Sequence, residues 1–285
     1  MCADPALLFS HRRDAGRTGE PPPLPEPLRV PVLDSHAHLD LMGVDVDEAL
    51  ADARSVGVDV VVQVGVDVAS SRWSAELAAR AAGVHAAVAV HPNEAGRGAA
   101  TDEALREIEA LAALPHVRAV GETGLDHFRT ESPEGHRRQE ESFRAHIAIA
   151  KRTGCALVVH DRDAHDDVVR VLLDEGPPEH VVFHCFSGGP ELARTCVQHG
   201  FVMSFAGPVT FKPNDDLRAA AALAPPELLL VETDAPFLTP VPFRGRPNAP
   251  SLVPLTVRSL AASTGHELDE LCTVLAANGR RVFGS

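Results

Sequence analysis

The chain has 285 residues and 45% hydrophobic content, enough to bury the core of one large domain or two small ones. Its formal net charge of −14 argues against a broad basic surface for duplex DNA, but not against a nucleic acid held by metals and a few arginines. No apolar run approaches the roughly 18 residues of a membrane span, so we expect no membrane partner.

Residues 1–30 differ from the rest of the chain. They include Pro21-Pro22-Pro23, carry charges and lack the apolar segment of a secretory signal. We expect them to form a flexible leader. No break in composition divides residues 31–285, which we predict to form a single domain.

From Val30 onward, short β-branched apolar runs alternate with Ala-, Leu-, Glu- and Arg-rich segments of helical period. The predicted strands are Val32–Asp34, Val58–Val64, Ala86–Val90, Val117–Val120, Ala156–Val159, Val181–Phe183, Phe201–Ser204 and Leu228–Val231. The predicted helices are Asp47–Ser55, Ser70–Ala82, Asp102–Ala113, Glu134–Arg152, Ala164–Glu175, Pro190–His199, Asp215–Leu223, Leu252–Ala262 and Glu267–Val282. Strands separated by helices run parallel with right-handed crossovers. The pattern predicts an α/β fold, a closed (β/α)8 TIM barrel, with a doubly wound open sheet as the alternative.

The first predicted strand leads into His36-Ala37-His38. Residues two apart in a strand point to the same side, so both imidazoles can face one point. Imidazole suits zinc, manganese and similar ions, but two imidazoles cannot complete a site. The motif therefore predicts further ligands at later strand ends, and the alternative is a pair of surface histidines.

Four more candidate ligands follow later strands: Glu122, His160, His184 and Asp234. In a barrel, the loops after the strands form one face, where active sites lie. Four imidazoles and two carboxylates are enough for two divalent ions with positions left for water. Paired ions need a bridging ligand, and a carboxylate bridges with its two oxygens, so we expect Glu122 between them.

Other residues at this face allow two interpretations. His91 contacts substrate or orients a loop, and Arg162 reaches a phosphate or forms a salt bridge. Arg246 and Asn248 lie in a Pro- and Gly-rich loop that binds substrate or is merely solvated. Asp234 could cap the next segment, but its position at a strand end favours the roles of ligand and general base.

Three residues near the candidate ligands are expected to act differently. Glu232 and Asp126 are candidates for holding ligands in place through hydrogen bonds. Cys185 follows His184 and should point the opposite way, into the core. The remaining histidines are expected to be solvated or to cap helices: His11, His85, His116, His127, His136, His146, His165, His180, His199 and His266.

Taken together, these motifs resemble the TatD-type metal-dependent deoxyribonucleases of the amidohydrolase-like barrel superfamily. The resemblance rests on ordered segments from about Val32 to Phe283: Asp34–His38, Gly121–Asp126, His160–Arg162, His184–Gly188 and Val231–Leu238. It implies a (β/α)8 fold and a 3′→5′ exonuclease activity on DNA. It also implies that His36, His38, Glu122 and Asp234 hold one metal ion, and that Glu122, His160 and His184 hold a second. A role in DNA repair or in the degradation of damaged DNA would follow.

We therefore predict a metal-dependent deoxyribonuclease that hydrolyses single-stranded DNA ends with two divalent ions, Mg, Mn or Zn. Asp234 would accept or orient the proton of the attacking water, while Arg162 and the metals would stabilise charge on the phosphate oxygens. The alternatives are a hydrolase of an amide, lactone or aminoacyl ester on the same barrel, and a binding protein with a structural metal. We expect a monomer. Five scattered cysteines without a C-x-x-C motif fit a reducing cytoplasm.

Overall fold

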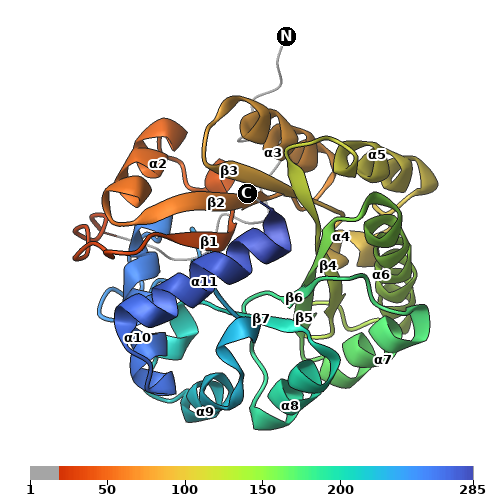
Figure 1. The fold of residues 1–285 in the computed structure, drawn as a ribbon. Coiled ribbons are helices and arrows are strands. Elements are labelled where there is room, and N and C mark those ends of the chain that lie inside the picture. The colour runs from red at the N-terminus through yellow and green to blue at the C-terminus, as the bar shows by residue number, and fades with distance from the viewer. Residues whose placement is uncertain (1–18, 285) are drawn as a thin grey trace.

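Eight parallel strands surround a common axis in the computed structural model, which describes residues 19–284 (Figure 1). The strands pair in chain order from β1 to β8. Their bounds are β1 Val32–Ala37, β2 Val58–Val64, β3 Val84–Val88, β4 Val117–Asp126, β5 Ala156–Arg162, β6 Val181–Phe183, β7 Val202–Phe205 and β8 Leu229–Val231. The predicted (β/α)8 barrel is confirmed, and the open sheet is excluded because β8 returns to β1 through a parallel bridge between Ala37 and Ala235.

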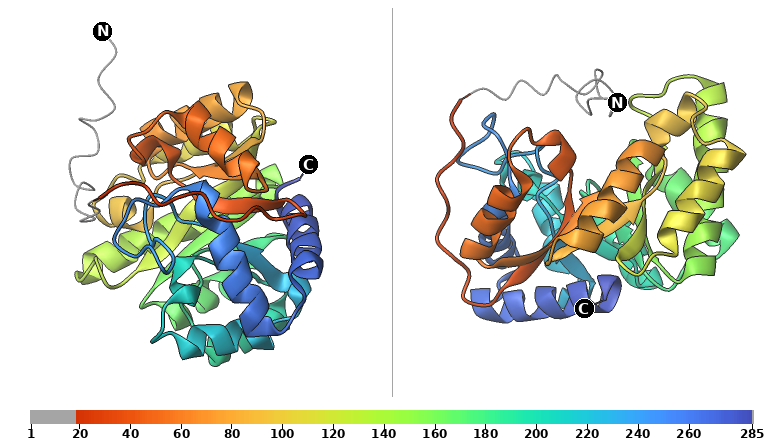
Figure 2. Two further views of the ribbon diagram at one scale, coloured as in Figure 1. Left: turned by 90° about the vertical axis from the view of Figure 1, so that its left-hand side faces the viewer. Right: turned by 90° about the horizontal axis from the view of Figure 1, so that it is seen from above.

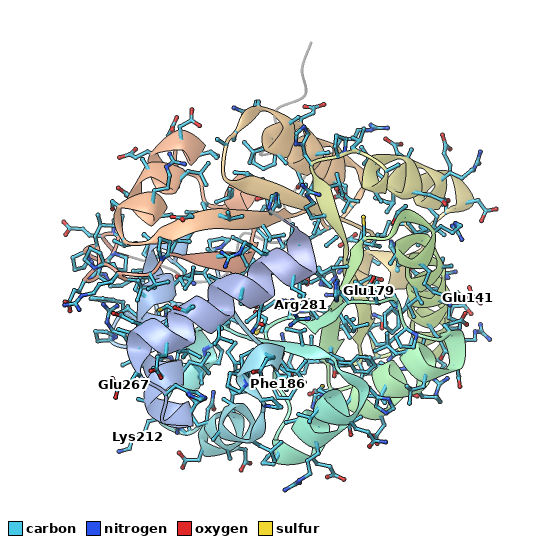
Figure 3. The ribbon with its side chains drawn as sticks, in the orientation of Figure 1. Glu141, Glu179, Phe186, Lys212, Glu267 and Arg281 are labelled. Atoms are coloured by element: carbon cyan, nitrogen blue, oxygen red, sulfur yellow. The ribbon has the colours of Figure 1, made fainter. Side chains whose placement is uncertain are left out.

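Helices surround the strands, as the sequence pattern requires for a sheet buried on both faces. The α-helices are α2 Val46–Ser55, α3 Val68–Arg80, α4 Pro92–Gly96, α5 Asp102–Ala112, α6 Pro133–Thr153, α7 His165–Glu175, α8 Pro190–His199, α9 Asp215–Leu223, α10 Val253–Thr264 and α11 Leu268–Phe283. Short 3-10 turns are η1 Leu39–Leu41, η2 Gly207–Thr210, η3 Pro226–Leu228 and η4 Pro250–Leu252. Charged side chains such as Glu141 and Lys212 point away from the barrel, whereas Phe186 points inward (Figure 3). No helix in the described part of the chain has the length and apolar character needed to span a membrane.

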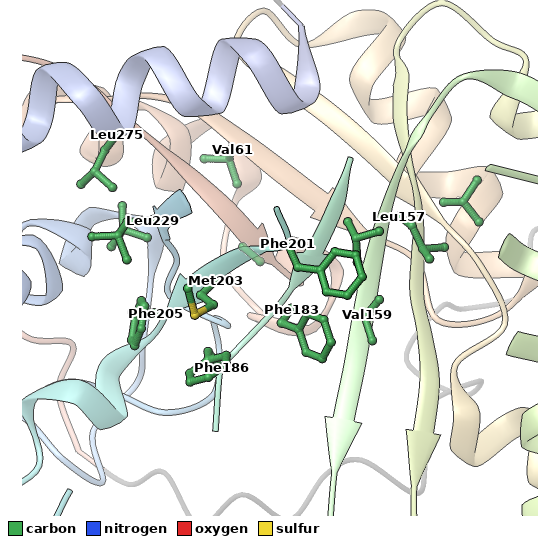
Figure 4. Packing of buried hydrophobic residues seen from close by; sticks show 14 of the residues in the cluster. Val61, Leu157, Val159, Phe183, Phe186, Phe201, Met203, Phe205, Leu229 and Leu275 are labelled. Atoms are coloured by element: carbon green, nitrogen blue, oxygen red, sulfur yellow. The ribbon is translucent and has the colours of Figure 1, made fainter. Parts of the chain in front are cut away.

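Two apolar layers stabilise the barrel. Side chains such as Val62, Val158 and Leu230 form a cluster with the end of α11, whereas their neighbours along the strands belong to a larger cluster shared with the other helices. Figure 4 shows part of the larger layer, in which Leu157, Phe183 and other outward-pointing residues pack together. This alternation follows from the two-residue period of a strand.

Helix α11 lies across the amino-terminal end of the strands (Figures 1 and 2). The Asn278 amide donates to the carbonyl oxygens of Pro226 and Leu229, each at 2.8 Å. Val282 and Phe283 join the inner apolar cluster. Because α11 covers this end, a substrate must reach the interior from the other end, where the strands finish.

Strands β4 and β5 run further than predicted. The sequence indicated an end at Val120, because Gly121 and Gly124 interrupt the apolar pattern. In the structure the β4–β5 pairing has an irregularity after Val120 and then continues as far as Asp126 opposite Arg162. His160 is therefore positioned by paired backbone opposite Gly124, and Glu122 lies within the irregularity between the paired residues Val120 and Thr123. Paired backbone is more rigid than a loop, and an irregularity of this kind redirects a side chain.

The part of the predicted leader that the structure describes, residues 19–30, forms no helix or strand and runs along the outside of the barrel (Figure 2). Leu28 is buried, and its N–H donates to the Val56 carbonyl at 3.0 Å. The Arg258 guanidinium donates to the Glu26 carbonyl at 2.8 Å. Ordered contacts therefore begin before Val30, earlier than predicted. The rest of the predicted leader, residues 1–18, lies outside the described residues, as does His11.

His146 on α6 is a buried structural residue, so the expectation that it is solvated or caps a helix was wrong. Its Nε2 accepts from the Val90 N–H at 3.1 Å, and its Nδ1 lies 2.7 Å from the Ser142 carbonyl. This imidazole therefore connects α6 to the segment after β3. Burial lowers the pKa of His146 from 6.5 to about 4.

We predict that His146 makes folding stability depend on pH. The unfolded chain protonates this side chain below pH 6.5, whereas the folded chain resists protonation down to about 4. Its contribution is therefore fully present above pH 6.5 and is lost toward pH 4, with a slope of up to about 1.4 kcal/mol per pH unit. Urea unfolding of His146→Gln should show lower stability at neutral pH, but a shallower loss on acidification than the unchanged chain. Parallel pH profiles would contradict this role.

Candidate metal centre

The six predicted ligands lie together at the end of the barrel opposite α11. They come from β1, β4 and β5 and from the segments that follow β1, β6 and β8: His36, His38, Glu122, His160, His184 and Asp234. These strands are far apart in sequence, but parallel strands of a closed barrel finish at one edge. The convergence expected from the strand ends is therefore present in the structure.

The Glu122 carboxylate is the common member of two groups of donor atoms. Its Oε1 lies 3.4 Å from His38 Nε2 and 3.9 Å from His36 Nε2. Its Oε2 lies 3.0 Å from His184 Nε2 and 3.2 Å from His160 Nδ1. Each oxygen thus faces a different pair of imidazoles, which is the arrangement expected of a bridging carboxylate.

Asp234 completes the first group. Its Oδ1 lies 3.6 Å from His38 Nε2 and 3.8 Å from His36 Nε2. Its own backbone has φ 53°, and its N–H donates to the His36 carbonyl at 2.9 Å. The backbone on both sides of the β8–β1 junction therefore holds this carboxylate against the two histidines.

Asp34, on β1, connects this strand to the segment after β8. It accepts hydrogen bonds from Thr233 N–H at 3.0 Å and Thr233 Oγ1 at 2.5 Å, and from His36 N–H at 3.2 Å. Burial raises the pKa of Asp34 to about 7, against the opposing effect of these donors. The side chain thus fixes the segment that carries His36 relative to the segment that carries Asp234.

The outer nitrogens of three ligand histidines have partners. His184 Nδ1 lies 3.3 Å from Glu232 Oε1, as expected for an orienting carboxylate. His160 Nε2 lies 3.2 Å from Asp126 Oδ2, and His38 Nδ1 lies 3.0 Å from the Val64 carbonyl. Such hydrogen bonds set the orientation of a ligand imidazole and increase its basicity.

Burial and neighbouring charges give these groups different pKa values. Burial, together with nearby His184, lowers the pKa of His36 well below its usual range. Burial opposes ionisation of Glu122, but the nearby His91 and His184 hold its pKa well below the usual range. Burial also raises the pKa of Asp234 to about 8, with the Glu122 carboxylate adding to the effect and His184 opposing it.

This donor set fits divalent metal ions. It combines buried imidazole nitrogens with carboxylate oxygens, and in each of three groups of residues the donor atoms lie within 4.8 Å of one another. An ionised Glu122 and a neutral His36 are the forms that bind a metal. The mixture suits zinc or manganese through nitrogen and admits magnesium through oxygen.

His91 and Arg162 lie beside the donor groups. His91 Nε2 is 3.6 Å from Glu122 Oε2, and its ring centroid is 4.6 Å from that of His160. His91 thus lies beside the second group, and its Nδ1 also accepts from the Asn93 N–H at 3.0 Å, which orients the start of α4. Arg162 is exposed at the end of β5, two residues beyond His160.

Arg246 and Asn248 use their side chains to hold chain segments. The Arg246 guanidinium donates to the carbonyls of Glu20 and Pro21, each at 2.8 Å. Asn248 is buried, and its amide donates to the carbonyls of Thr233, at 2.9 Å, and Phe237. These contacts hold the loop after β8 in place, and substrate binding by either residue stays a prediction. The sequence contained no signal for their distant backbone partners.

The prediction that Cys185 is a core residue was wrong. β6 ends at Phe183, so strand alternation does not extend to Cys185, which has φ 42° and is only partly buried. Its N–H donates to Glu232 Oε1 at 2.8 Å. The backbone here helps to hold the carboxylate that orients His184.

The fold and the donor set define a barrel hydrolase of the metal-dependent class. A family model described as TatD related DNase matches residues 33–284, and the chain therefore belongs to this family. It is a metal-dependent hydrolase that acts on ester bonds.

Named relatives agree with this assignment. The chain is 44% identical over 260 residues to an uncharacterized metal-dependent hydrolase TatD of Mycobacterium tuberculosis, covering 89% of this chain and 98% of the relative. It is 34% identical over 250 residues to the 3′-5′ ssDNA/RNA exonuclease TatD of Escherichia coli, covering 84% and 93%. Among solved structures, YJJV, a TatD homologue from Escherichia coli, aligns with a TM-score of 0.83 at 27% identity, covering 89% of this chain and 98% of that one.

We predict that Glu232 contributes to metal affinity without touching the ion. Glu232→Gln keeps the shape of the side chain but removes the charge that faces His184 Nδ1, so Mn²⁺ affinity should fall by about 10-fold or more. Isothermal titration calorimetry measures the change. Glu227→Gln, an exposed glutamate in η3 just before β8, is the matched control, whereas Glu232 follows β8. Equal affinities for the two variants would contradict the prediction.

We also predict that metal binding displaces protons. Burial by itself would lower the pKa of His184. The carboxylates of Glu122 and Glu232 outweigh this effect and raise the pKa well above its usual range. Near neutral pH the imidazole therefore keeps a proton that a metal must replace. Calorimetry with Mn²⁺ in two buffers of different ionisation enthalpy should detect proton release, and affinity should increase from about pH 6 to 8. Affinity independent of pH would oppose this interpretation.

Proposed function

We propose that this protein is a 3′→5′ exonuclease that removes nucleotides from single-stranded DNA ends with two divalent ions, Mg²⁺, Mn²⁺ or Zn²⁺. The observation that carries the proposal is the Glu122 carboxylate, whose two oxygens face two separate pairs of imidazoles. His36, His38, Glu122 and Asp234 would hold one ion. Glu122, His160 and His184 would hold the other. The name of the Escherichia coli relative, a 3′-5′ ssDNA/RNA exonuclease, supports the substrate and the direction.

Divalent ions bound here would supply a nucleophile at neutral pH and neutralise charge on the phosphoryl group. A residue of the chain must then accept the proton that the attacking water loses. Asp234 is suited to this task because its Oδ1 faces His36 and His38 in the first donor group, and because burial raises the pKa of its carboxyl above that of an ordinary aspartate, which makes it a stronger proton acceptor. The bond from its N–H to the His36 carbonyl fixes the backbone from which this carboxylate acts.

Arg162 supplies a positive charge at the edge of the site. It lies two residues beyond His160 on β5 and is exposed, so a phosphate held at the donor groups is within reach of a long side chain. Its planar guanidinium can donate two hydrogen bonds to one phosphate. We assign it to the non-bridging oxygens, where charge develops during displacement.

The overall charge supports a preference for strand ends. A net charge of −14 repels the dense phosphates of a long duplex. A single-stranded end presents few phosphates and fits a local positive site. The cysteines that the structure describes are free, which supports a location in the reducing cytoplasm. We propose that the protein is a monomer and that it degrades damaged DNA.

We predict that Asp234→Asn abolishes a metal-dependent exonuclease ladder. The amide keeps the size of the side chain but cannot accept the proton, so kcat should fall by about 100-fold or more. The assay uses 5′-labelled single-stranded DNA with Mn²⁺ or Mg²⁺, with and without chelator. Asp52→Asn, an exposed position on α2, is the matched control.

A descending ladder that requires both metal and Asp234 supports the proposal. If the metal-loaded protein cleaves no DNA but hydrolyses an ester, lactone or amide, the nuclease assignment is wrong and the alternative hydrolase replaces it.

A further inference from the structure

Phe128 is an exposed aromatic side chain at the open end of the barrel. It is 55% exposed, and it is the one aromatic among the large apolar side chains that are exposed in residues 19–284. Exposing such a ring to water costs free energy that packing usually recovers. An exposed flat ring at the rim of a site is also a surface on which a base can stack.

The backbone holds Phe128 close to the metal centre. Asp126, two residues earlier, lies opposite Arg162 in the β4–β5 register, and the His127 N–H donates to the Arg162 carbonyl at 3.0 Å. Asp126 also contacts His160 Nε2 at 3.2 Å. Phe128 thus lies on the edge just beyond the residues that orient one of the two donor groups.

The Arg162 guanidinium lies on the Phe128 ring, with Cζ 4.1 Å from the ring centroid. Among the described residues, no carboxylate forms an ion pair with Arg162, whereas Arg144 and Arg170 on the helices each pair with several. A stacked guanidinium keeps its N–H donors in the plane of the group, where they are free to meet a phosphate.

A second pair of this kind lies on the same face. Arg244 Cζ is 4.0 Å from the centroid of Phe211, and these residues belong to the loops after β8 and β7. Among the described residues, Arg244 also has no carboxylate partner. Arginine stacked on phenylalanine therefore recurs at the end of the barrel where the strands finish.

We propose that Phe128 stacks on a base of the single-stranded substrate, while Arg162 contacts the adjacent phosphate. Flat aromatic surfaces combined with cations bind single strands without regard to sequence, because every base has a flat face and every nucleotide has a phosphate. Phe128 is thus a substrate-positioning residue. This inference rests on the proposed nuclease function and extends it from the phosphate to the base.

The test compares two 5′-labelled oligonucleotides, one normal and one with abasic residues at its last two 3′ positions. Phe128→Ala should raise KM for normal DNA by roughly 5- to 100-fold with little change in kcat. Phe128→Trp should retain a low KM. On abasic DNA the unchanged chain and Phe128→Ala should behave alike, because no base is present to stack.

Leu114→Ala is the matched control, since Leu114 is 44% exposed and precedes β4 at the opposite end of the barrel. Equal Mn²⁺ affinity in all variants shows that the metal centre is intact. If Phe128→Ala cleaves normal DNA as well as the unchanged chain, the stacking role is overturned and the nuclease function stands. If the unchanged, metal-loaded chain cleaves neither oligonucleotide, the nuclease function fails and the stacking role fails with it.

Discussion

A single buried carboxylate, Glu122, makes the rest of this site possible. Four imidazoles, from β1 and the residue after it, from β5 and from the residue after β6, converge on one region, and the rings would repel one another if more than one were positively charged. Glu122 lies among them with one oxygen toward His36 and His38 and the other toward His160 and His184. The attraction outweighs the cost of burying its charge, as the low pKa of Glu122 indicates. The buried negative charge of Glu122 therefore holds the four imidazoles close together, and the same charge favours the binding of cations among them.

The two ends of the barrel have different roles: one stabilises the fold and the other carries the candidate metal centre. At one end, α11 covers the strands, with Val282 and Phe283 in the inner apolar cluster and the Asn278 amide bonded to backbone carbonyls. At the other end, β4 and β5 extend their pairing beyond the apolar core. Asp126 and His160 lie on this paired backbone, and Glu122 lies in the irregularity that begins it. The strands can extend with polar residues because the apolar clusters formed by the earlier part of each strand already stabilise the barrel.

The sequence predicted those features that depend on strand periodicity and on the convergence of parallel strands. All eight strands, and the meeting of His36, His38, Glu122, His160, His184 and Asp234, follow from these two rules. The length of β4 did not follow, because Gly121 and Gly124 interrupt the apolar pattern while the backbone continues to pair. The roles of Arg246 and Asn248 depend on carbonyl groups of Glu20, Pro21, Thr233 and Phe237, and no local pattern shows where a distant backbone will lie. Cys185 departed from expectation because β6 is only three residues long.

The junction between β8 and β1 has a further consequence. The described strands meet there through one backbone bridge, helped by Asp34 and by the bond from the Asp234 N–H to the His36 carbonyl. Among the neighbouring strands of the barrel, this junction has the fewest bridged residue pairs. It is also where His36 and His38 on one side face Asp234 on the other. A cation shared by these three side chains would therefore link β1 to the segment after β8 and help to keep the barrel closed. The supply of metal would then govern how often the barrel opens as well as how fast it turns over substrate, and an ion-depleted chain would be the form most exposed to proteolysis.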